Sequence, residues 1–286
     1  MTDADLWKKT FVALPEDERF FEYCISAVRS HPPHKQGQVI LLIGEPGAGK
    51  SAMLRALCRR LNKALGVEDH RRGAIRFDMP MPCTNRAISL EMRRALGDPA
   101  ASGSATDNMD VVRHLTKAYG TRFMGIDEAH NIGEDRGEVS TSKRVFMKRS
   151  FNELGGIYGL AGTPALAPIM TSDPELRRRI LRRFDVLPVP KGDPTYISYL
   201  GKLDVACGMP ELSGLDEPDR AARIWESTRG RKGITYDFLD YARDVAIEEG
   251  AKRIEEVHLR RAFFERIALN DLKMPNPFDR GRSVTR

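Results

Sequence analysis

The sequence lacks a long hydrophobic run, and its first residues, Met1 to Asp5, are acidic rather than basic. A helix that spans a bilayer needs about 20 consecutive, mostly apolar residues. A secretory signal needs a basic region followed by a hydrophobic one. We therefore expect a cytoplasmic protein with no membrane partner.

Cysteine is also scarce, and its spacing gives no indication of a metal site. The 286 residues include four cysteines, which are far apart and form no C-x-x-C pair, and six histidines without the H-E-x-x-H spacing. These patterns favour neither a zinc site nor a disulfide framework. We expect buried thiols at Cys24, Cys58, Cys83 and Cys207.

Internal repeats are absent, and the excess of positive charge is small. Lys and Arg number 46 against 40 Asp and Glu, which gives a net charge of +6 at pH 7. That excess is compatible with a polyanionic partner, although basic runs are about as often solvated helix faces. With 41% hydrophobic residues, the chain can form one large or two modest domains.

The most informative segment is a complete phosphate-binding pattern, G-x-x-x-x-G-K-[ST]. It follows the apolar run Val39–Ile43 and precedes a helical pattern, the context in which backbone N–H groups of such a loop cradle phosphates. Lys50 would contact the β- and γ-phosphates, and the Ser51 hydroxyl would ligate Mg²⁺. The residues predicted to bind ATP or GTP are Gly44, Glu45, Pro46, Gly47, Ala48, Gly49, Lys50 and Ser51.

An acidic pair complements this loop. Arg122–Glu128 is a short, mostly apolar stretch ending in two carboxylates, which would be costly to bury without a cation or water. Asp127 would bind the nucleotide's Mg²⁺ through its water shell, and Glu128 would polarise the water that attacks the γ-phosphate. Acidic residues also begin many surface loops, so the pair indicates hydrolysis only together with the phosphate loop.

Strand and helix patterns alternate after residue 38, which predicts a parallel sheet covered by helices. A leading helix from Pro15 to Val28 should stop at His31–Pro33. The expected strands are 39–43, 74–79, 122–128, 157–161 and 184–189, and the expected helices are 51–65, 86–96, 108–119 and 141–154. After Pro190 the strand signals disappear.

These patterns predict an α/β fold in four parts. Residues 1–37 form an N-terminal helical segment, and residues 38–190 form an αβα nucleotide-binding core with a parallel sheet. Residues 191–272 form a small helical lid domain. Residues 273–286, which are rich in Pro, Gly and Arg, form a mobile basic tail.

Several motifs besides the phosphate loop share a recognisable order along the chain. They are Asp78–Pro82 before a helix ending at Leu96–Pro99, Asp127–Ile132, Phe151–Leu154, Gly162–Ala165, and Asp173–Leu176 leading to Arg183–Phe184. This set resembles the AAA+ ATPases, and in finer detail the transposition regulators TniB, TnsC and MuB, TniB most closely. The resemblance covers most of the chain and implies a P-loop αβα sandwich with a helical lid that uses ATP and Mg²⁺.

The resemblance also implies roles for further residues. Thr163, at the tip of the strand beside Asp127, would orient the attacking water, although a threonine before proline also suits a helix N-cap. Arg183, in the arginine-rich segment before the last core strand, would act as a finger in a neighbouring subunit's nucleotide site. Arg182 and Arg179 are competitors, and these arginines could instead form a DNA-facing or solvated surface.

DNA contacts would require basic side chains that each subunit repeats along one groove or pore. Position points to Arg86 at a helix start and to the basic helix with Lys143, Arg144 and Lys148. No motif for reading base edges is present, so we expect little sequence preference.

The sequence Asp-Glu-Ala-His at 127–130 is also a helicase box. Helicases of that class need a second motor domain, and the residues after Pro190 are too few and too helical to form one. We therefore expect His130 to be a local hydrogen-bonding residue.

Three functions remain in consideration. The resemblance implies an ATP-dependent, largely sequence-nonspecific protein that oligomerises on double-stranded target DNA, as a ring or helical filament, and recruits a transposase. A TniQ-like targeting protein would be a further partner. The alternatives are another DNA-loaded AAA+ ATPase, such as a helicase loader or initiator, and a nucleotide-switched interaction module without DNA. A neighbouring transposase gene would favour the first, and a neighbouring replication gene the second.

Overall fold

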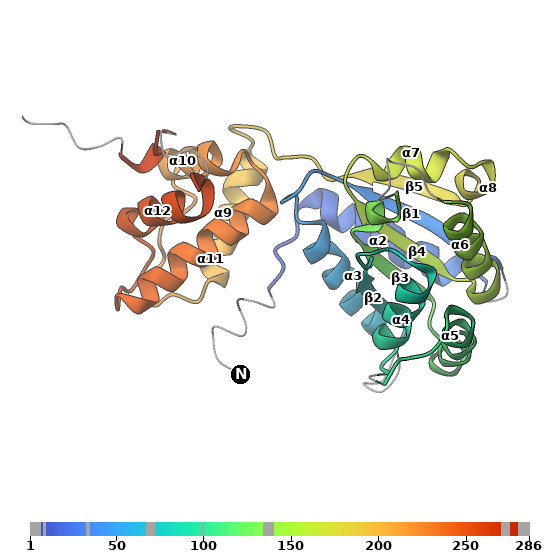
Figure 1. The fold of residues 1–286 in the computed structure, drawn as a ribbon. Helices are drawn as coiled ribbons and strands as arrows, with labels where there is room; N and C mark the ends of the chain where they lie inside the picture. The colour runs from blue at the N-terminus through green and yellow to red at the C-terminus, as the bar shows by residue number, and fades with distance from the viewer. Residues whose placement is uncertain are drawn as a thin grey trace, which may run out of the picture. The chain divides into compact units, whose positions relative to one another are not determined.

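The computed structural model describes residues 7, 10–32, 35–66, 72–98, 100–133, 140–269 and 275–279. The chain divides into two compact units, labelled by element in Figure 1. The sheet unit comprises Glu16–Pro46 and Lys50–Val186. The helical unit comprises Met1–Pro15, Gly47–Gly49 and Leu187–Arg286.

Five strands form the sheet of the sheet unit, in the order β2-β3-β4-β1-β5. Their bounds are β1 Gln38–Ile43, β2 Ala74–Asp78, β3 Phe123–Asp127, β4 Ile157–Gly162 and β5 Ile180–Asp185. Every pairing is parallel, which confirms the sheet predicted from the alternation of strands and helices. Because β4 lies between β1 and β3, the carboxyl ends of these three strands are neighbours at one edge of the sheet.

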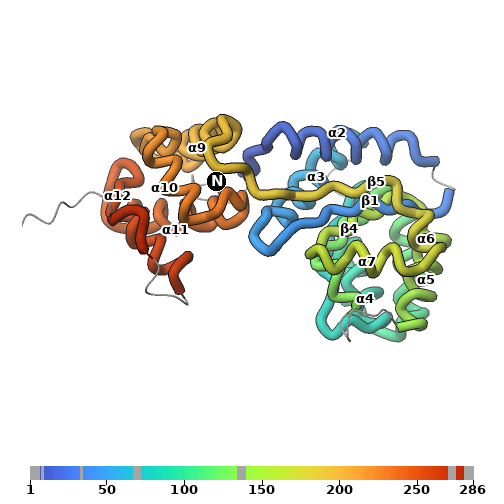
Figure 2. The backbone as a smooth tube through the Cα atoms, turned by 90° about the horizontal axis from the view of Figure 1, so that it is seen from above, coloured from blue at the N-terminus to red at the C-terminus, as the bar shows by residue number. Residues whose placement is uncertain are grey.

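Helices cover both faces of this sheet, as Figure 2 shows. One face carries α2 (Pro15–Ser30) and α3 (Lys50–Ala64). The other carries α4 (Asn85–Ala95), α5 (Ala105–Tyr119), α6 (Thr141–Leu154) and α7 (Leu166–Thr171). The fold class is therefore the predicted α/β P-loop sandwich, and the two short helices α7 and α8 (Pro174–Arg177) are additions that the hydrophobic pattern did not indicate.

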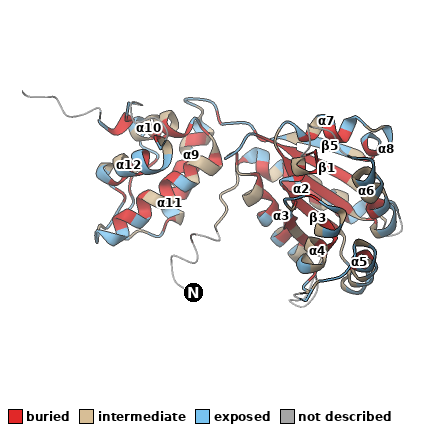
Figure 3. Ribbon diagram, viewed as in Figure 1, coloured by how far each residue is buried: buried red, intermediate tan, exposed pale blue. Residues whose placement is uncertain are grey.

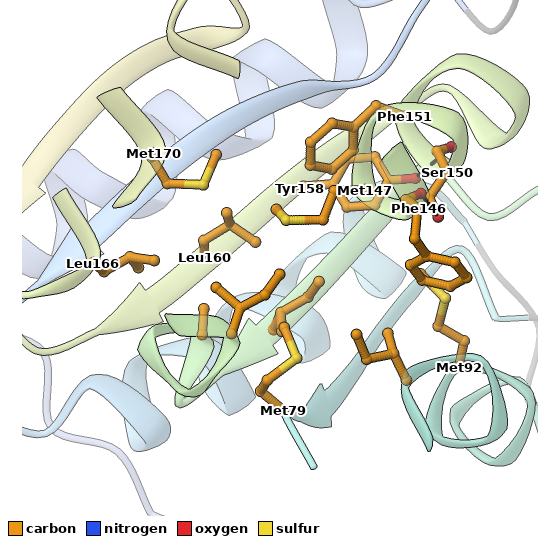
Figure 4. A pocket seen from close by; sticks show the side chains of 14 residues that line it. Met79, Met92, Phe146, Met147, Ser150, Phe151, Tyr158, Leu160, Leu166 and Met170 are labelled. Atoms are coloured by element: carbon orange, nitrogen blue, oxygen red, sulfur yellow. Dashed lines mark hydrogen bonds between the residues drawn. The ribbon is translucent and has the colours of Figure 1, made fainter. Parts of the chain in front are cut away.

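The larger core of the sheet unit lies between the sheet and helices α4 to α7. Figure 3 shows the central strands β1, β3 and β4 as almost continuously buried, which is expected for parallel strands covered on both faces. Figure 4 shows methionine and aromatic side chains around a small cavity in this core, including Met79, Met147, Phe151 and Tyr158. Its volume of about 20 Å³ is close to that of one water molecule, so the core is nearly close-packed.

Glycines in the middle of the sheet let α3 approach closely. A Cβ atom at Gly159 in β4 would lie 2.6 Å from Cζ of Phe123 and 3.5 Å from Cδ2 of Leu54 on α3. A Cβ atom at Gly125 in β3 would lie 3.3 Å from Cε1 of Phe123 and 3.6 Å from Cδ2 of Leu54. The absence of side chains at these two positions makes room for the fully buried Phe123 ring.

The helical unit contains α9 (Pro194–Ala206), α10 (Pro218–Thr228), α11 (Lys232–Glu248) and α12 (Glu256–Ala262), followed by a π-helical turn (Phe263–Ile267) and the short helix Pro277–Asp279. This agrees with the helical pattern after Pro190. Its core also includes residues from the N-terminal segment: Trp7 is 1% exposed, stacks on Tyr236 with ring centroids 4.7 Å apart, and donates to Asp240. Trp7 and Leu14 thus pack with the helical unit, whereas α2 packs with the sheet unit.

Part of the segment expected to be a mobile tail is packed. Phe278 is 1% exposed and stacks on Phe238 of α11, and its N–H group donates to the Asn276 side chain. Residues 273–274 and 280–286 of the expected tail lie outside the described residues.

The last strand differs from the prediction. The pattern indicated residues 184–189, but β5 spans Ile180–Asp185. Because β5 is an edge strand, only Ile180 and Phe184 are even partly buried, and its other side chains are exposed. The apolar residues after Asp185 gave the stronger signal, although they lie beyond the strand.

All four cysteines are unpaired by disulfides and buried, as the sequence suggested. Burial raises the pKa of the Cys58 thiol to about 12 and also raises the pKa of the Cys24 and Cys207 thiols. Within the described ranges, none of the helices has both the length and the apolar character that crossing a membrane would take.

Candidate nucleotide site

The phosphate loop connects the buried strand β1 to helix α3, which begins at Lys50. Gly47 and Gly49 have φ angles of +75° and +97°, a region that side chains disfavour. The first N–H groups of an α-helix have no partner within the helix and attract anions. The loop and helix start therefore fit a nucleotide phosphate chain.

Lys50 provides a buried positive charge at this loop. Its side chain is largely enclosed, and Nζ donates to the carbonyl oxygens of Gly44 at 2.7 Å and Glu45 at 3.0 Å. Burial lowers the pKa of Lys50, and the negative charges of Glu128, Asp127 and Glu45 oppose that shift. The ammonium group is thus held within the loop. When a nucleotide binds, its phosphate oxygens could accept the hydrogen bonds that the carbonyl oxygens accept here.

Asp127 ends β3 with a carboxylate that is almost completely buried, since the residue is 1% exposed. Its Oδ1 atom accepts from the N–H group of Glu128 at 3.0 Å. Its Oδ2 atom accepts from the Arg76 guanidinium at 2.9 Å. A buried carboxylate needs such partners, and these two fix the orientation of the group at the strand end.

Glu128 leaves the strand in a conformation that is rare for any residue other than glycine, with a φ angle of +48°. Such conformations concentrate at functional sites, because the surrounding structure must hold them in place. The side chain is 49% exposed, and Oε2 lies 3.4 Å from Nδ1 of His130. That nitrogen is buried and makes no hydrogen bond among the described residues, so the local hydrogen-bonding role of His130 stays a prediction.

Ser51 and Asp127 are the residues predicted to hold magnesium. Ser51 lies in the first turn of α3, and Asp127 ends the strand next but one to β1 in the sheet. Among the described residues, no group of three or more His, Cys, Asp or Glu side chains is arranged to hold a metal. A hydroxyl and one buried carboxylate fit Mg²⁺, which keeps most of its water and binds nucleotide phosphates.

Thr163 follows β4, the strand between those of Asp127 and the phosphate loop. The Gly44 N–H group donates to the carbonyl oxygen of Gly162 at 3.1 Å, which links the start of the loop to the residue before Thr163. The alternative interpretation of Thr163 as a helix N-cap is wrong, because α7 is capped at Ala165 without a side-chain hydrogen bond. Its role in orienting water stays a prediction.

The three candidate finger arginines differ in their surroundings. Arg179 is 5% exposed and donates to the Gly37 carbonyl at 3.1 Å and to Asn152 at 2.6 Å, so it supports the fold. The Arg182 guanidinium lies over the rings of Tyr23 and Phe184. Arg183 is exposed and pairs with Asp185 at 2.6 Å.

The structure places Arg183 differently from the prediction. Because β5 begins at Ile180, Arg183 lies within the strand rather than before it. The exposed arginines that precede the strand are Arg177 and Arg178, at the end of α8. The prediction of a finger is unaffected, but the segment before the strand now favours these two residues.

The candidate DNA contacts are also unequal. Arg86 is exposed near the start of α4, and its Nε donates to the Gly103 carbonyl at 2.8 Å. Lys143 donates to the Ile132 carbonyl at 3.4 Å, and Arg144 is half-buried. Lys148 is already paired with two carboxylates, those of Asp173 at 2.8 Å and Glu175 at 3.2 Å.

Sequence reasoning missed Arg76, the residue of β2 that contacts Asp127. A charged residue within the short run Ala74–Asp78 was a visible signal. Its partner could not be identified from the sequence, because the pairing depends on β2 and β3 being adjacent in the sheet.

Comparisons with known proteins agree with this geometry. A family described as AAA domain matches residues 34–180. None of the curated proteins matches the chain.

Solved structures are similar over most of the chain. The ORC2 protein of Aeropyrum pernix, in ADPNP-ADP complexes, has a TM-score of 0.67 and 15% identity, covering 92% of this chain and 71% of that one. The ORC1 protein of Aeropyrum pernix in complex with DNA has a TM-score of 0.66 and 19% identity, and the match covers 90% of this chain and 66% of that one. Cdc6p of Pyrobaculum aerophilum has a TM-score of 0.63 and 17% identity, and the match covers 93% of this chain and 72% of that one. At these identities the likeness concerns the fold.

Proposed function

The chain belongs to the AAA domain family, and we propose that it is an ATPase that assembles on double-stranded DNA and recruits a transposase to it. The observation that carries the ATPase part is the arrangement of the sheet. The order β3-β4-β1 brings Asp127, Thr163 and the phosphate loop to the same edge. These are the groups that phosphoryl transfer to water requires.

In this proposal each residue has one task. The backbone of Gly44–Ser51 and the Lys50 ammonium bind the phosphates. Ser51 and Asp127 would hold magnesium, which would supply charge neutralisation at the phosphates. Glu128 has the more exposed carboxylate and polarises the attacking water. Thr163 orients that water from the end of β4.

The DNA part of the proposal rests on charge and on the resemblance to transposition regulators. Basic residues exceed acidic ones by six, and Arg86 and the α6 residues Lys143 and Arg144 supply candidate phosphate contacts. Phosphate contacts give affinity without reading sequence. A transposase, and with it a TniQ-like targeting protein, is the partner that the motifs around Asp127, Phe151 and Asp173 favour.

An initiator or helicase loader is the second candidate. The similar structures include an ORC1 protein in complex with DNA and a Cdc6p, which favours this candidate over a module without DNA. Both candidates share nucleotide-dependent DNA binding and differ in the protein that they recruit.

The test measures binding of an unrelated set of duplexes with ATP, with a non-hydrolysable analogue and without nucleotide. We expect tight, sequence-independent binding only with nucleotide, and its loss in Lys50→Ala. Pull-down with DNA-bound protein and a purified transposase encoded beside the gene then separates the two candidates. Equal DNA binding with and without nucleotide would reject both, whereas no DNA binding under any condition would support the DNA-free module.

A further inference from the structure

Arg76 lies on the face of β2 that is turned away from the main core. Its neighbours Ile75 and Phe77 belong to the core cluster between the sheet and α4 to α7. Because side chains alternate along a strand, Arg76 lies on the face covered by α3. The register of β2 with β3 pairs Arg76 with Gly125 and Asp78 with Asp127.

This register places two carboxylates side by side. Asp78 and Asp127 are opposite one another on adjacent strands, an arrangement in which like charges repel. Arg76 lies two residues before Asp78 on the same face, so its side chain can reach both groups. One guanidinium nitrogen, Nη2, lies 2.9 Å from Asp127 Oδ2 and 2.5 Å from Asp78 Oδ1.

The two carboxylates differ greatly in their access to solvent. The side chain of Asp127 is 2% exposed, that of Arg76 is 22% exposed and that of Asp78 is 64% exposed. The guanidinium therefore lies between a buried carboxylate at the nucleotide site and an exposed one at the edge of the sheet. If Asp127 binds another group, the Arg76 guanidinium still has the Asp78 carboxylate as an acceptor.

The hydrogen bonding of Arg76 is incomplete in this position. A guanidinium has five N–H donors and bonds a carboxylate best with two nitrogens in parallel. Here a single nitrogen serves both carboxylates, while the buried Nε has no hydrogen-bond partner among the described residues. A buried ion pair with a purely structural role is stabilising only when the remaining N–H donors of the guanidinium are hydrogen-bonded. The arrangement instead fits a contact that can be exchanged.

We propose that Arg76 is a positioning residue that holds Asp127 until the nucleotide site is filled. Arg76 orients and neutralises the Asp127 carboxylate, and it passes to Asp78 when Asp127 accepts hydrogen bonds from the water shell of nucleotide-bound magnesium. The inference rests on the proposed nucleotide function. Its consequence is that Arg76 competes with magnesium for Asp127 and thereby sets the magnesium concentration at which nucleotide binds.

The first test is a magnesium titration of the binding of a fluorescent ATP analogue, which does not depend on hydrolysis. Arg76→Met should lower the half-saturating magnesium concentration roughly three- to tenfold, within the range of coupling between contacting charged groups. Arg76→Lys keeps the charge and should give an intermediate value. Arg94→Met is the matched control, because Arg94 pairs on the surface of α4 with Glu91 and should leave the titration unchanged.

A second variant separates exchange from a simple charge effect. Asp78→Asn weakens the alternative acceptor, so Arg76 should stay on Asp127 and the half-saturating magnesium concentration should rise. In the Arg76→Met background the same substitution should have little effect. An equal rise in both backgrounds would mean that Asp78 acts only as a nearby negative charge, and the exchange would be rejected.

The contact itself is tested without nucleotide. Arg76→Met and Asp127→Asn should each change the melting temperature, and the double variant should differ clearly from the sum of the two changes. Additive changes together with an unaltered magnesium titration would overturn the proposal. If the wild-type protein bound no nucleotide at any magnesium concentration, the proposed function and the exchange would both fail, while non-additive melting temperatures would still support the contact.

Discussion

Glu128 combines a left-handed backbone conformation with a half-exposed carboxylate, whereas its neighbour Asp127 is extended and buried. The left-handed conformation of Glu128 ends the strand directly after Asp127, so the Glu128 side chain does not continue the alternation of β3. Asp127 stays fixed by Arg76 and by the Glu128 N–H group. The strained backbone at Glu128 thus lies where the proposed function assigns different tasks to two adjacent carboxylates.

Lys50 and Glu128 should fail in different ways when substituted. Lys50→Ala removes the buried charge of the phosphate loop, so nucleotide binding should be lost. Glu128→Gln keeps the shape of the side chain but removes the base, so ATP should bind normally while hydrolysis slows about 10²- to 10⁴-fold, the usual contribution of a general base. Binding of a fluorescent nucleotide and single-turnover hydrolysis measure the two effects.

Two comparisons make this result interpretable. Glu153→Gln on α6 is a control, because Glu153 pairs with Arg113 and Arg149 away from the loop and should leave hydrolysis unchanged. Hydrolysis at the wild-type rate in Glu128→Gln would reject Glu128 as the base. Loss of binding in the same variant would instead give Glu128 a part in holding the nucleotide.

The elements that the sequence predicts best are those whose hydrophobic pattern is complete within one segment. The β1 strand, expected at 39–43, is Gln38–Ile43, and the helix expected at 141–154 is Thr141–Leu154. Continuous apolar runs and helical periodicity specify such elements locally. The phosphate loop and Asp127 could also be identified from the sequence, because each belongs to a motif of adjacent residues in one segment.

Features that depend on strand order could not be predicted in this way. The exposed β5 has few buried apolar residues, so the strand was predicted at 184–189, C-terminal to most of its actual position. For the same reason Arg183 was predicted to precede the strand, although it lies within it. The contact of Arg76 with Asp127 requires β2 to lie beside β3. Both errors concern the edges of the sheet, where pairing and burial differ from those at the centre.

The close contact between β4 and Phe123 predicts a stability effect. Gly159→Ala would place a Cβ atom 2.6 Å from the Phe123 ring and 3.5 Å from Leu54 of α3. We expect it to lower the free energy of unfolding by about 1–3 kcal/mol, the usual cost of overpacking. Chemical denaturation measures this change, and Gly159→Ala with Phe123→Leu should recover part of the loss. A double variant no more stable than expected from adding the single effects would reject the steric explanation.

The segment from α8 into β5 predicts which arginine acts on a neighbouring subunit. Arg178→Ala should reduce ATP hydrolysis in assembled protein while leaving nucleotide affinity intact, because a finger contributes only to the transition state. Mixing that variant with Lys50→Ala should restore some hydrolysis at interfaces that combine an intact loop with an intact arginine. The same mixtures with Arg177→Ala and Arg183→Ala identify the finger among the three.

Arg179→Ala serves as the comparison for this experiment. Arg179 donates to Gly37 and Asn152 inside the sheet unit, so its substitution should lower the melting temperature and should not be rescued by mixing. If none of the mixtures recovers activity although mixed assembly is confirmed, the finger lies outside this segment.

At the scale of the whole molecule, the chain combines a candidate nucleotide site, exposed arginines beside an edge strand and a positive net charge. A finger that acts in trans requires assembly, and assembly on DNA repeats each basic contact once per subunit. Affinity for DNA should then be steeply dependent on salt, because every phosphate contact releases counterions. Protein concentration and nucleotide state should control binding together.

ATP should therefore drive the protein to form a ring or a helical filament around double-stranded DNA, and hydrolysis should release it. Electron microscopy with duplex DNA and a non-hydrolysable ATP analogue, at several protein concentrations, tests the assembly. Arg86→Ala should weaken binding about equally for unrelated duplexes and reduce the salt slope by about one per subunit contact. Lys148→Ala should change the slope less, because its ammonium already pairs with Asp173 and Glu175. Monomers under all conditions, with no DNA retained at low salt, would reject assembly on DNA and favour the DNA-free switch.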